Sequence, residues 1–324
     1  MIKIALDMMG GDNAPSCNIG GVIDYLDENN NSAKIYLVGK SNDIIEELKS
    51  VSNFNSKNIE IIDAPQTITS NDRPSRILKE KPNSSMVESI NLLKNNVVDA
   101  VVSAGNTGCL LSSSFFTLGT IEGIKRPALA AFIPSENGNF LICDVGANST
   151  AKPLHLLQFS KMASIYINNQ SNIQKPTIGL LNIGLEKGKG NPLTKESYEL
   201  MEKHLENFVG NVESRNIFNG EANIIVCDGF TGNIVLKLIE GMASYNLNLI
   251  SSRLKLDQSK KIDDIKKIYD YEEYGATPIL GIKGLVLKSH GSSSKVSIKN
   301  ALKASEKLYK LNLINKFKNI SYES

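Results

Sequence analysis

Glycines, asparagines, small hydroxyls and a few lysines cluster in five stretches of the 324-residue chain, each following an apolar run of strand length. In one of them, the run Ile178–Ile183 leads into a loop that carries Lys189 and Asn191 among glycines. A buried strand that ends in a flexible, amide-rich, cationic loop suits a bound anion. The five stretches are PTIGLLNIGLEKGKGN (176–191), VVSAGNTG (101–108), LICDVGAN (141–148), IIVCDGFTGN (224–233) and LVLKSHGSSS (285–294).

The elements that must position these loops are buried strands alternating with amphipathic helices. This alternation predicts an α/β fold, a three-layer α/β/α Rossmann-like domain with a mostly parallel mixed sheet. A turn at Asn137-Gly138 predicts one antiparallel pair within it, Ala128–Ile133 with Phe140–Cys143. In an open α/β sheet the loops gather at the carboxyl ends of the strands. We therefore expect a single domain over residues 1–324, with the five loops around one cleft.

A long helical pattern follows the fourth loop. From Ile234 apolar residues recur at helical spacing up to Leu254, and a second helix with four lysines is expected from Ser259 to Tyr269. The sequence therefore predicts a helix hairpin over 234–270 that projects from the body. Such a hairpin is most often a dimer contact, and the alternative is a basic tip that touches a membrane.

Composition excludes several function classes. Hydrophobic residues make up 41% of the chain and the net charge is +2, which is typical of a globular enzyme and gives no reason to expect nucleic-acid binding. The four cysteines are widely spaced and predict buried thiols. The apolar start ends at Asp7, too early for a signal peptide, and no run approaches a membrane span, so we expect a cytosolic protein.

Familiar catalytic and cofactor motifs are missing from the sequence. There is no HExxH, no carboxylate cluster of metal-ligand spacing, no G-x-S-x-G, no P-loop and no complete dinucleotide fingerprint. We therefore expect no metal site. Of the three histidines, His290 is the best candidate for a functional imidazole because it directly follows a strand, and a capping role is its equal alternative.

One reaction suits a cleft of glycine amides, asparagines, hydroxyls and lysines, namely attack of phosphate on a thioester. Phosphate is already an anionic nucleophile at neutral pH, and a thiol leaves without a strong acid because its pKa is only about 8–9. The enzyme must then align the reactants and stabilise the tetrahedral oxyanion.

The same residues carry a resemblance that runs through nearly the whole chain. The chain resembles the phosphate acyltransferase family (PlsX), which makes acyl phosphate from acyl–acyl carrier protein for phospholipid synthesis. Asn13 departs from the family pattern, which usually has histidine there, and this puts an acid–base role for that position in doubt. The matching motifs are IALDMMGGDNAP (4–15), VSAGNTG (102–108), RPA (126–128), DVGAN (144–148), HLLQF (155–159), LLNIG…KGN (180–191), CDGFTGN (227–233) and SHGSS (289–293).

The resemblance implies a fold like the isocitrate and isopropylmalate dehydrogenases, a homodimer and no redox cofactor. It also implies peripheral membrane contact and transfer of the product to a membrane glycerol-phosphate acyltransferase. The tip of the predicted hairpin is more polar than the apolar tip of membrane-binding relatives. Membrane contact would then depend on lysines and anionic lipid, through Lys255, Lys260, Lys261, Lys266 and Lys267.

We hypothesise three groups of site residues. Amides around Gly105–Gly108 and Gly229–Gly232 hold phosphate, and three cations dock the acidic acyl carrier protein by charge complementarity. Expected catalytic residues are Lys189, Asn191 and His290; expected substrate-binding residues are Asp12, Asn106, Thr107, Gly108, Asn148, Asp228, Gly229 and Asn233; the expected docking residues are Arg73, Arg76 and Lys79.

Three alternatives remain open at the sequence level. A phosphotransacetylase-like enzyme that uses coenzyme A would need the same cleft but no carrier protein. A decarboxylating dehydrogenase of similar fold would need a metal-binding aspartate cluster, which the sequence lacks. A non-catalytic membrane scaffold would not need so many polar loops at strand ends.

Overall fold

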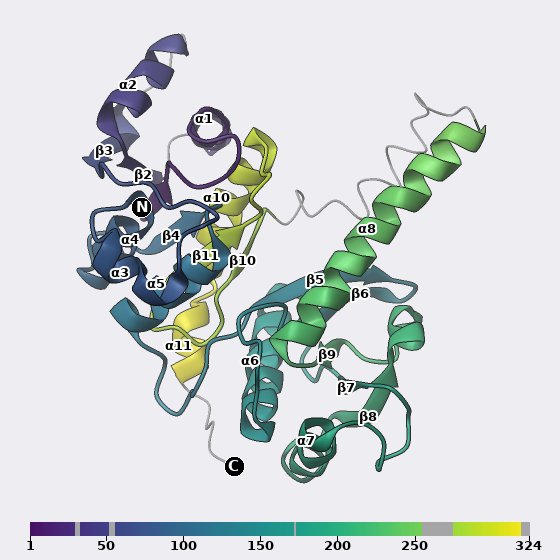
Figure 1. The fold of residues 1–324 in the computed structure, drawn as a ribbon. Coiled ribbons are helices and arrows are strands. Elements are labelled where there is room, and N and C mark those ends of the chain that lie inside the picture. Colours follow the sequence, from purple (N-terminus) through teal and green to yellow (C-terminus); the bar gives the residue numbers. More distant parts are fainter. Residues whose placement is uncertain (30–32, 52–55, 172, 255–274, 319–324) are drawn as a thin grey trace. The chain divides into compact units, whose positions relative to one another are not determined.

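The buried apolar runs of the sequence form two separate sheets in the computed structural model (Figure 1). The structure describes residues 1–29, 33–51, 56–171, 173–254 and 275–318. These residues group into two compact units. The first unit takes the described residues within 1–122 and 271–319, and the second takes those within 123–270.

The first unit has a six-stranded sheet in the order β10-β11-β4-β1-β2-β3. All neighbouring strands are parallel except β10 and β11. The central strands are buried on both faces, as expected of a parallel sheet covered by helices. The strands are β1 (Ile2–Asp7), β2 (Ala33–Gly39), β3 (Ile59–Asp63), β4 (Ala100–Ser103), β10 (Ala276–Pro278) and β11 (Leu285–Ser289).

Helices of the first unit pack on this sheet in pairs. α1 packs with α10, and α4 packs with α5, while α4 and α10 both contact the central strands β1 and β4. Side-chain caps start two of these helices, because Asn106 and Ser294 accept hydrogen bonds from the first-turn amides of α5 and α10. The helices are α1 (Ser16–Glu28), α2 (Ser41–Ser50), η1 (Ser56–Asn58), η2 (Pro74–Arg76), α3 (Ile77–Glu80), α4 (Ser85–Lys94), α5 (Thr107–Leu118), α10 (Lys295–Lys310) and α11 (Leu313–Lys318).

The second unit has a five-stranded sheet in the order β5-β6-β9-β7-β8. The strands β5 and β6 form the antiparallel pair predicted from the Asn137-Gly138 turn, at one edge of the sheet, and the other pairs are parallel. α6 packs on β6 and β9, and α7 packs on β7 and β8. The elements are β5 (Ala130–Ser135), β6 (Gly138–Cys143), α6 (Pro153–Ser171), β7 (Ile178–Asn182), α7 (Pro192–His204), β8 (Phe208–Glu213), η3 (Ser214–Asn219), β9 (Ile224–Val226) and α8 (Gly229–Leu254).

α8 is the longest described helix and extends far beyond the strands of its own unit (Figure 1). It forms the first arm of the predicted hairpin but begins at Gly229, five residues before the expected start. The second arm, with the lysines at its tip, lies outside the described residues. Within the described part of the chain, no helix is both long and apolar enough to cross a membrane.

The α/β class is confirmed, but the arrangement differs from the single domain with one sheet expected over 1–324. Two sheets replace the one, because β11 returns from the carboxyl-terminal part of the chain to pair with β4, whereas β5 to β9 pair only with one another. Both sheets are mostly parallel with one antiparallel edge strand. Local sequence patterns specify a strand but not its neighbour in space, which explains the difference.

Candidate functional site

Three loops meet at the carboxyl edge of the first unit's sheet, after β1, β4 and β11. The Asp12 backbone N–H donates to the Gly291 carbonyl at 2.8 Å, joining the first loop to the third. A Cβ atom added to Gly10 would lie 2.8 Å from the Gly105 amide nitrogen, so the first loop also lies directly on the second. The structure thus brings together five of the predicted site residues, namely Asp12, Asn106, Thr107, Gly108 and His290.

A buried carboxylate holds this edge in place. Asp7 ends β1 and accepts hydrogen bonds from the Ser85 hydroxyl at 2.5 Å and the Ser103 hydroxyl at 2.6 Å. Ser103 Oγ in turn accepts from the Gly105 amide at 3.1 Å. Burial raises the pKa of Asp7, and the bonds from the two serines and the Met9 backbone oppose that rise. Asp7 therefore ties β1, β4 and the start of α4 together beneath the glycine loops.

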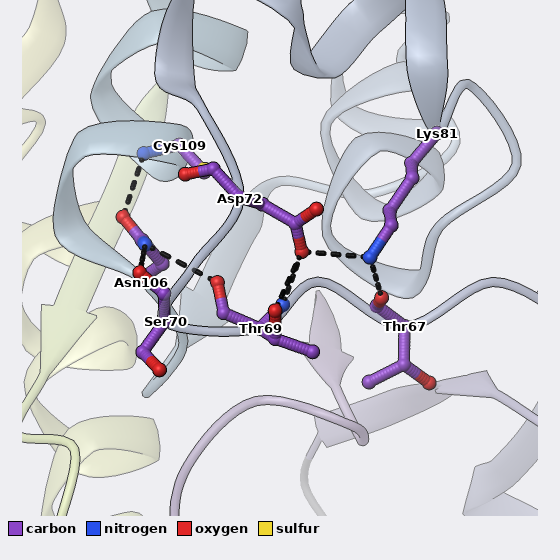
Figure 2. A network of polar contacts seen from close by, with 7 residues as sticks. All are labelled: Thr67, Thr69, Ser70, Asp72, Lys81, Asn106 and Cys109. Atoms are coloured by element: carbon purple, nitrogen blue, oxygen red, sulfur yellow. Dashed lines mark hydrogen bonds and ion pairs between the residues drawn. The ribbon is translucent and has the colours of Figure 1, made fainter.

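Asn106 caps α5 as predicted and also anchors a neighbouring loop (Figure 2). Its Oδ1 accepts from the Cys109 amide at 3.1 Å, and its Nδ2 donates to the carbonyls of Thr69 and Ser70, each at 3.3 Å. The N–H groups of Thr107 and Gly108, at the start of the helix, have no intrahelical acceptor. Asn106 therefore positions a helix start whose amides are available to an anion.

The loop before α3 is held by an ion pair at the centre of Figure 2. Lys81 Nζ lies 2.7 Å from Asp72 Oδ2 and donates to the Thr67 carbonyl at the same distance. Asp72 also accepts from the Thr69 amide at 2.6 Å, and these contacts lower the pKa of Asp72. Lys81, one of the four cations in the basic segment 73–81, is thus structural.

The three predicted docking cations are exposed. Arg73 immediately precedes η2, Arg76 ends η2 and Lys79 lies on α3; η2 packs against α5. A Cβ atom added to Gly108 would lie 2.7 Å from Pro74 Cγ, so this basic segment directly adjoins the start of α5. Arg76 pairs with Glu80 at 3.7 Å on the surface, a weak contact that leaves the segment basic.

His290 lies exposed in the turn after β11. Its Nδ1 lies 2.8 Å from the Ser292 hydroxyl and accepts from the Ser292 amide at 3.3 Å. Its carbonyl accepts from the Ser293 hydroxyl at 2.6 Å. The imidazole therefore helps to shape the turn through Nδ1.

The second unit repeats the use of a buried carboxylate at a strand end. Asp144 directly follows β6, and its Oδ1 accepts from the amides of Leu129 at 3.1 Å and Ala147 at 3.0 Å. Its Oδ2 accepts from the Asn148 backbone at 2.8 Å and from Asn148 Nδ2 at 2.9 Å. Burial raises the pKa of Asp144, opposed by these N–H donors. Asn148 also donates to the Pro127 carbonyl at 2.8 Å, so its amide group is held within the protein.

Gly229 and Asp228 build the start of α8. A Cβ atom added to Gly229 would lie 2.6 Å from Asp144 Oδ2, and the Gly229 amide donates to the Asn148 carbonyl at 2.8 Å. Asp228 caps the helix, because its carboxylate accepts from the Thr231 amide at 2.9 Å and the Thr231 hydroxyl at 2.8 Å. The Gly232 amide donates to the Asp228 carbonyl. Three of the four amides expected to hold phosphate here thus have acceptors in the protein.

Asn233 lies one turn further along α8, half-buried beside Gly146. A Cβ atom added to Gly146 would lie 3.5 Å from Asn233 Oδ1. Asn233 and the predicted residues Asn148, Asp228 and Gly229 therefore belong to one cluster in the second unit.

The loop after β7 presents Lys189 and Asn191 to solvent. Asn191 caps α7, accepting from the Thr194 amide at 2.9 Å. The Lys189 side chain is exposed and forms no ion pair with the described residues, whereas Lys187 pairs with Glu202 at 2.5 Å. Lys189 is therefore the cation of this loop that is available to a substrate.

Two buried asparagines, which the sequence analysis did not identify, hold this loop in place. Asn182 Nδ2 donates to Asn211 Oδ1 at 3.1 Å and to the Lys189 carbonyl at 3.2 Å. Asn211 Nδ2 donates to the Glu186 carbonyl at 2.9 Å. Their signal in the sequence is a polar residue inside an otherwise apolar run, since Asn182 precedes Ile183 and Asn211 precedes Val212.

The described residues contain no group of three or more histidine, cysteine, aspartate or glutamate side chains placed to hold a metal ion. Cys109, Cys143 and Cys227 are buried free thiols, and burial raises the pKa of each. These cysteines are therefore core residues in a protonated state at neutral pH.

The chain shares its α/β fold with a phosphotransacetylase of known structure. A phosphotransacetylase from Streptococcus pyogenes matches with a TM-score of 0.61 at 16% identity, over 95% of this chain and 94% of that one. A 4-hydroxythreonine-4-phosphate dehydrogenase from Klebsiella pneumoniae matches with a TM-score of 0.53 at 12% identity, over 94% and 98% of the two chains. At such identities the likeness shows the fold alone.

The sequence defines the family. The model of the family described as "Fatty acid synthesis protein" matches residues 2–316. A phosphate acyltransferase from Clostridium tetani is 42% identical, over 98% of this chain and 97% of that protein. Another from Dictyoglomus turgidum is 44% identical, over 97% and 96% of the two chains. The chain belongs to this fatty acid synthesis protein family (PlsX), and it is an enzyme of the phosphate acyltransferase type.

Proposed function

We propose that the protein transfers a fatty acyl group from acyl–acyl carrier protein to inorganic phosphate, giving acyl phosphate for phospholipid synthesis. The observation that carries this proposal is 42% identity to a phosphate acyltransferase over 98% of the chain. A phosphate oxygen attacks the thioester carbonyl, the C–S bond breaks, and the carrier thiolate leaves and is protonated. No redox cofactor enters this reaction.

The start of α5 supports a phosphate site in the first unit. The N–H groups of Thr107 and Gly108 lack intrahelical acceptors, and the helix dipole favours an anion there. The start of α8 is less suited because its first amide, that of Gly229, donates to the Asn148 carbonyl. The second unit has an exposed, unpaired cation among its described residues in the loop after β7, Lys189, which is of the kind that neutralises an oxyanion.

The basic segment supports the acyl carrier protein as partner. Arg73, Arg76 and Lys79 are exposed beside the start of α5, where an acidic carrier could deliver its thioester. Replacing all three with serine is expected to raise the KM for acyl–acyl carrier protein and to flatten its salt dependence, with the KM for phosphate unchanged. An unchanged KM for the carrier substrate would remove this segment from the proposal.

The test of the function is a product assay with two donors. The pure protein is incubated with phosphate and either palmitoyl–acyl carrier protein or palmitoyl-coenzyme A, and acyl phosphate is trapped with hydroxylamine as the hydroxamate. Product from the carrier substrate supports the proposal. Product from coenzyme A alone would instead support a phosphotransacetylase-like enzyme, a candidate favoured by the shared fold. No product from either donor would refute both.

We also propose a cytoplasmic homodimer that contacts the membrane peripherally and passes acyl phosphate to a membrane glycerol-phosphate acyltransferase. Support for the dimer comes from α8, whose exposed apolar side chains recur at spacings of three or four residues. A second copy of the helix would bury them. Light scattering of wild type and of Leu238→Glu tests this, because the variant should be monomeric. The stripe consists of Phe230, Ile234, Leu238, Met242, Tyr245 and Leu249.

A further inference from the structure

Three neighbouring strands of the first unit end in side chains that face the same way. Lys288 of β11 is in register with Ser103 of β4, and Ser103 bonds the Asp7 carboxylate at the end of β1. Residues in register on adjacent strands project from the same face of a sheet. The Lys288 side chain therefore emerges on the Asp7 side, at the edge where the three glycine-rich loops meet.

The Lys288 ammonium group lies between two of these loops. It donates to the Ala104 carbonyl at 3.4 Å, just before the start of α5, and to the Ser289 carbonyl. Among the residues that the structure describes, it forms no ion pair with a carboxylate. An ammonium group has three N–H donors. Two backbone carbonyls therefore leave one donor and the positive charge available.

The surroundings of this ammonium are backbone rather than side chain. Gly10 lies so close to Gly105 that a Cβ atom there would be 2.8 Å from the amide nitrogen, and Gly11 has φ +105. The absence of Cβ atoms lets the three loops pack directly on one another, so backbone groups lie around the ammonium. An edge with helix-start amides that lack intrahelical acceptors and with an adjacent cation suits a phosphate-type anion.

Burial also favours an anion beside Lys288. Desolvation lowers the pKa of Lys288 to about 8, although the charges of Asp7 and Asp12 raise it. The two Asp7 oxygens are engaged by Ser85 and Ser103, so Asp7 does not pair with the ammonium directly. A bound anion would supply the direct partner that the ammonium lacks.

We propose that Lys288 binds a phosphate-type oxyanion at the carboxyl edge of the first unit's sheet, together with the first amides of α5. This inference rests on the proposed function, in which that anion is the substrate phosphate. The competing explanation is that Lys288 only joins β4 to β11 through their carbonyls. The two explanations differ in whether the lysine contributes to anion binding.

Direct titration with inorganic phosphate separates them. Calorimetry without any acyl donor compares wild type with Lys288→Met, and with Lys283→Met as a matched control. Lys283 is exposed in the turn just before β11. Loss of one charge-assisted hydrogen bond is expected to weaken phosphate binding about 10- to 100-fold in Lys288→Met. Lys283→Met should bind like wild type.

A second variant covers the case in which Lys288→Met does not fold. Lys288→Arg keeps a positive charge that does not titrate, so its affinity for sulfate should not fall between pH 7 and 9. Wild-type affinity for sulfate should fall as pH rises through about 8. Asp7 and Asp12 face the ammonium and are the other groups whose charge must stay constant over this range.

The outcomes distinguish this inference from the proposed function. Wild type that binds phosphate but makes no acyl phosphate would refute the function and leave the anion site intact. If wild type is active and folded Lys288→Met binds phosphate as tightly as wild type, the inference is overturned and the function stands. Wild type that binds neither phosphate nor sulfate would also overturn it.

Discussion

Replacement of Asp144 by asparagine should destabilise the protein far more than the same replacement of Asp7. Both carboxylates are buried at strand ends. Their donors differ, however: Asp144 accepts four N–H bonds, three of them from backbone amides, whereas Asp7 accepts from the hydroxyls of Ser85 and Ser103 and from one backbone amide, that of Met9. A hydroxyl can rotate to accept a hydrogen bond, but an N–H group cannot.

The magnitude follows from this difference. Asparagine at position 144 keeps one oxygen for one pair of donors and turns its NH₂ group toward the other pair. Two bonds to a charged acceptor are then lost, at about 1.5–3 kcal/mol each, and relief of the buried charge offsets part of that loss. We expect a net loss of about 3 kcal/mol for Asp144→Asn. For Asp7→Asn one serine hydroxyl reverses, and the expected loss is about 1 kcal/mol.

Hydrogen exchange measures the loss locally. The amides of Leu129, Ala147 and Asn148 should exchange about 100-fold faster in Asp144→Asn, which is the rate ratio for about 3 kcal/mol. In urea, the unfolding midpoint should fall by roughly 1 M in Asp144→Asn and by much less in Asp7→Asn. Equal losses in the two variants, or unchanged exchange of the three amides, would refute the reasoning from donor type.

The remaining predictions concern the start of α5, the ion pair before it and the loop after β7. Asn106→Ala removes a helix cap and should lower the free energy of unfolding by about 1 kcal/mol by urea titration, with Asn106→Asp as the control that restores the cap. Lys81→Met should be less stable than wild type at neutral pH. Because Lys81 lowers the pKa of Asp72, that stability gap is present above pH 3.8 and should close as pH falls through the lowered value, as thermal melts at stepped pH would show. Lys189→Ala should lower turnover in the hydroxamate assay by more than about tenfold, or ~1.4 kcal/mol, whereas Lys203→Ala, an exposed change at the end of α7, should leave it unchanged. Turnover of Lys189→Ala within tenfold of wild type would remove that residue from the site.

Local features of the fold could be predicted from the sequence because local physics specifies them. The cap at Asn106 and the antiparallel pair after Ala128 depend on a few neighbouring residues. The division into two sheets could not be predicted, since β11 pairs with β4 across more than 180 residues of sequence. No local pattern encodes that pairing.

Within the site, the sequence identified residue types but not their partners. Lys187 and Lys189 are equivalent in the sequence, yet an ion pair with Glu202 engages only Lys187. The sequence alone does not single out Lys288, because a lysine near the end of a strand usually lies in solvent. Its value as a candidate depends on the carbonyls of Ala104 and Ser289, which only the fold places beside it.

The two units share one local arrangement, a buried aspartate at a strand end beside a glycine loop, but different hydrogen-bond donors bind the two carboxylates. In each unit, an aspartate at the end of a strand lies directly against a glycine. A Cβ atom added to Gly10 would lie 2.6 Å from Asp7 Oδ2, and one added to Gly229 would lie 2.6 Å from Asp144 Oδ2. The carboxylate holds the loop at the strand end, and the glycine allows this close contact because it has no side chain. In the first unit the fixing bonds come from two serines and the Met9 backbone, and the Thr107 and Gly108 amides of α5 have no intrahelical acceptor. In the second unit three backbone amides and the Asn148 side chain make those bonds, and the first amide of α8 is engaged as well, so the start of α5 is the better suited of the two to an anion.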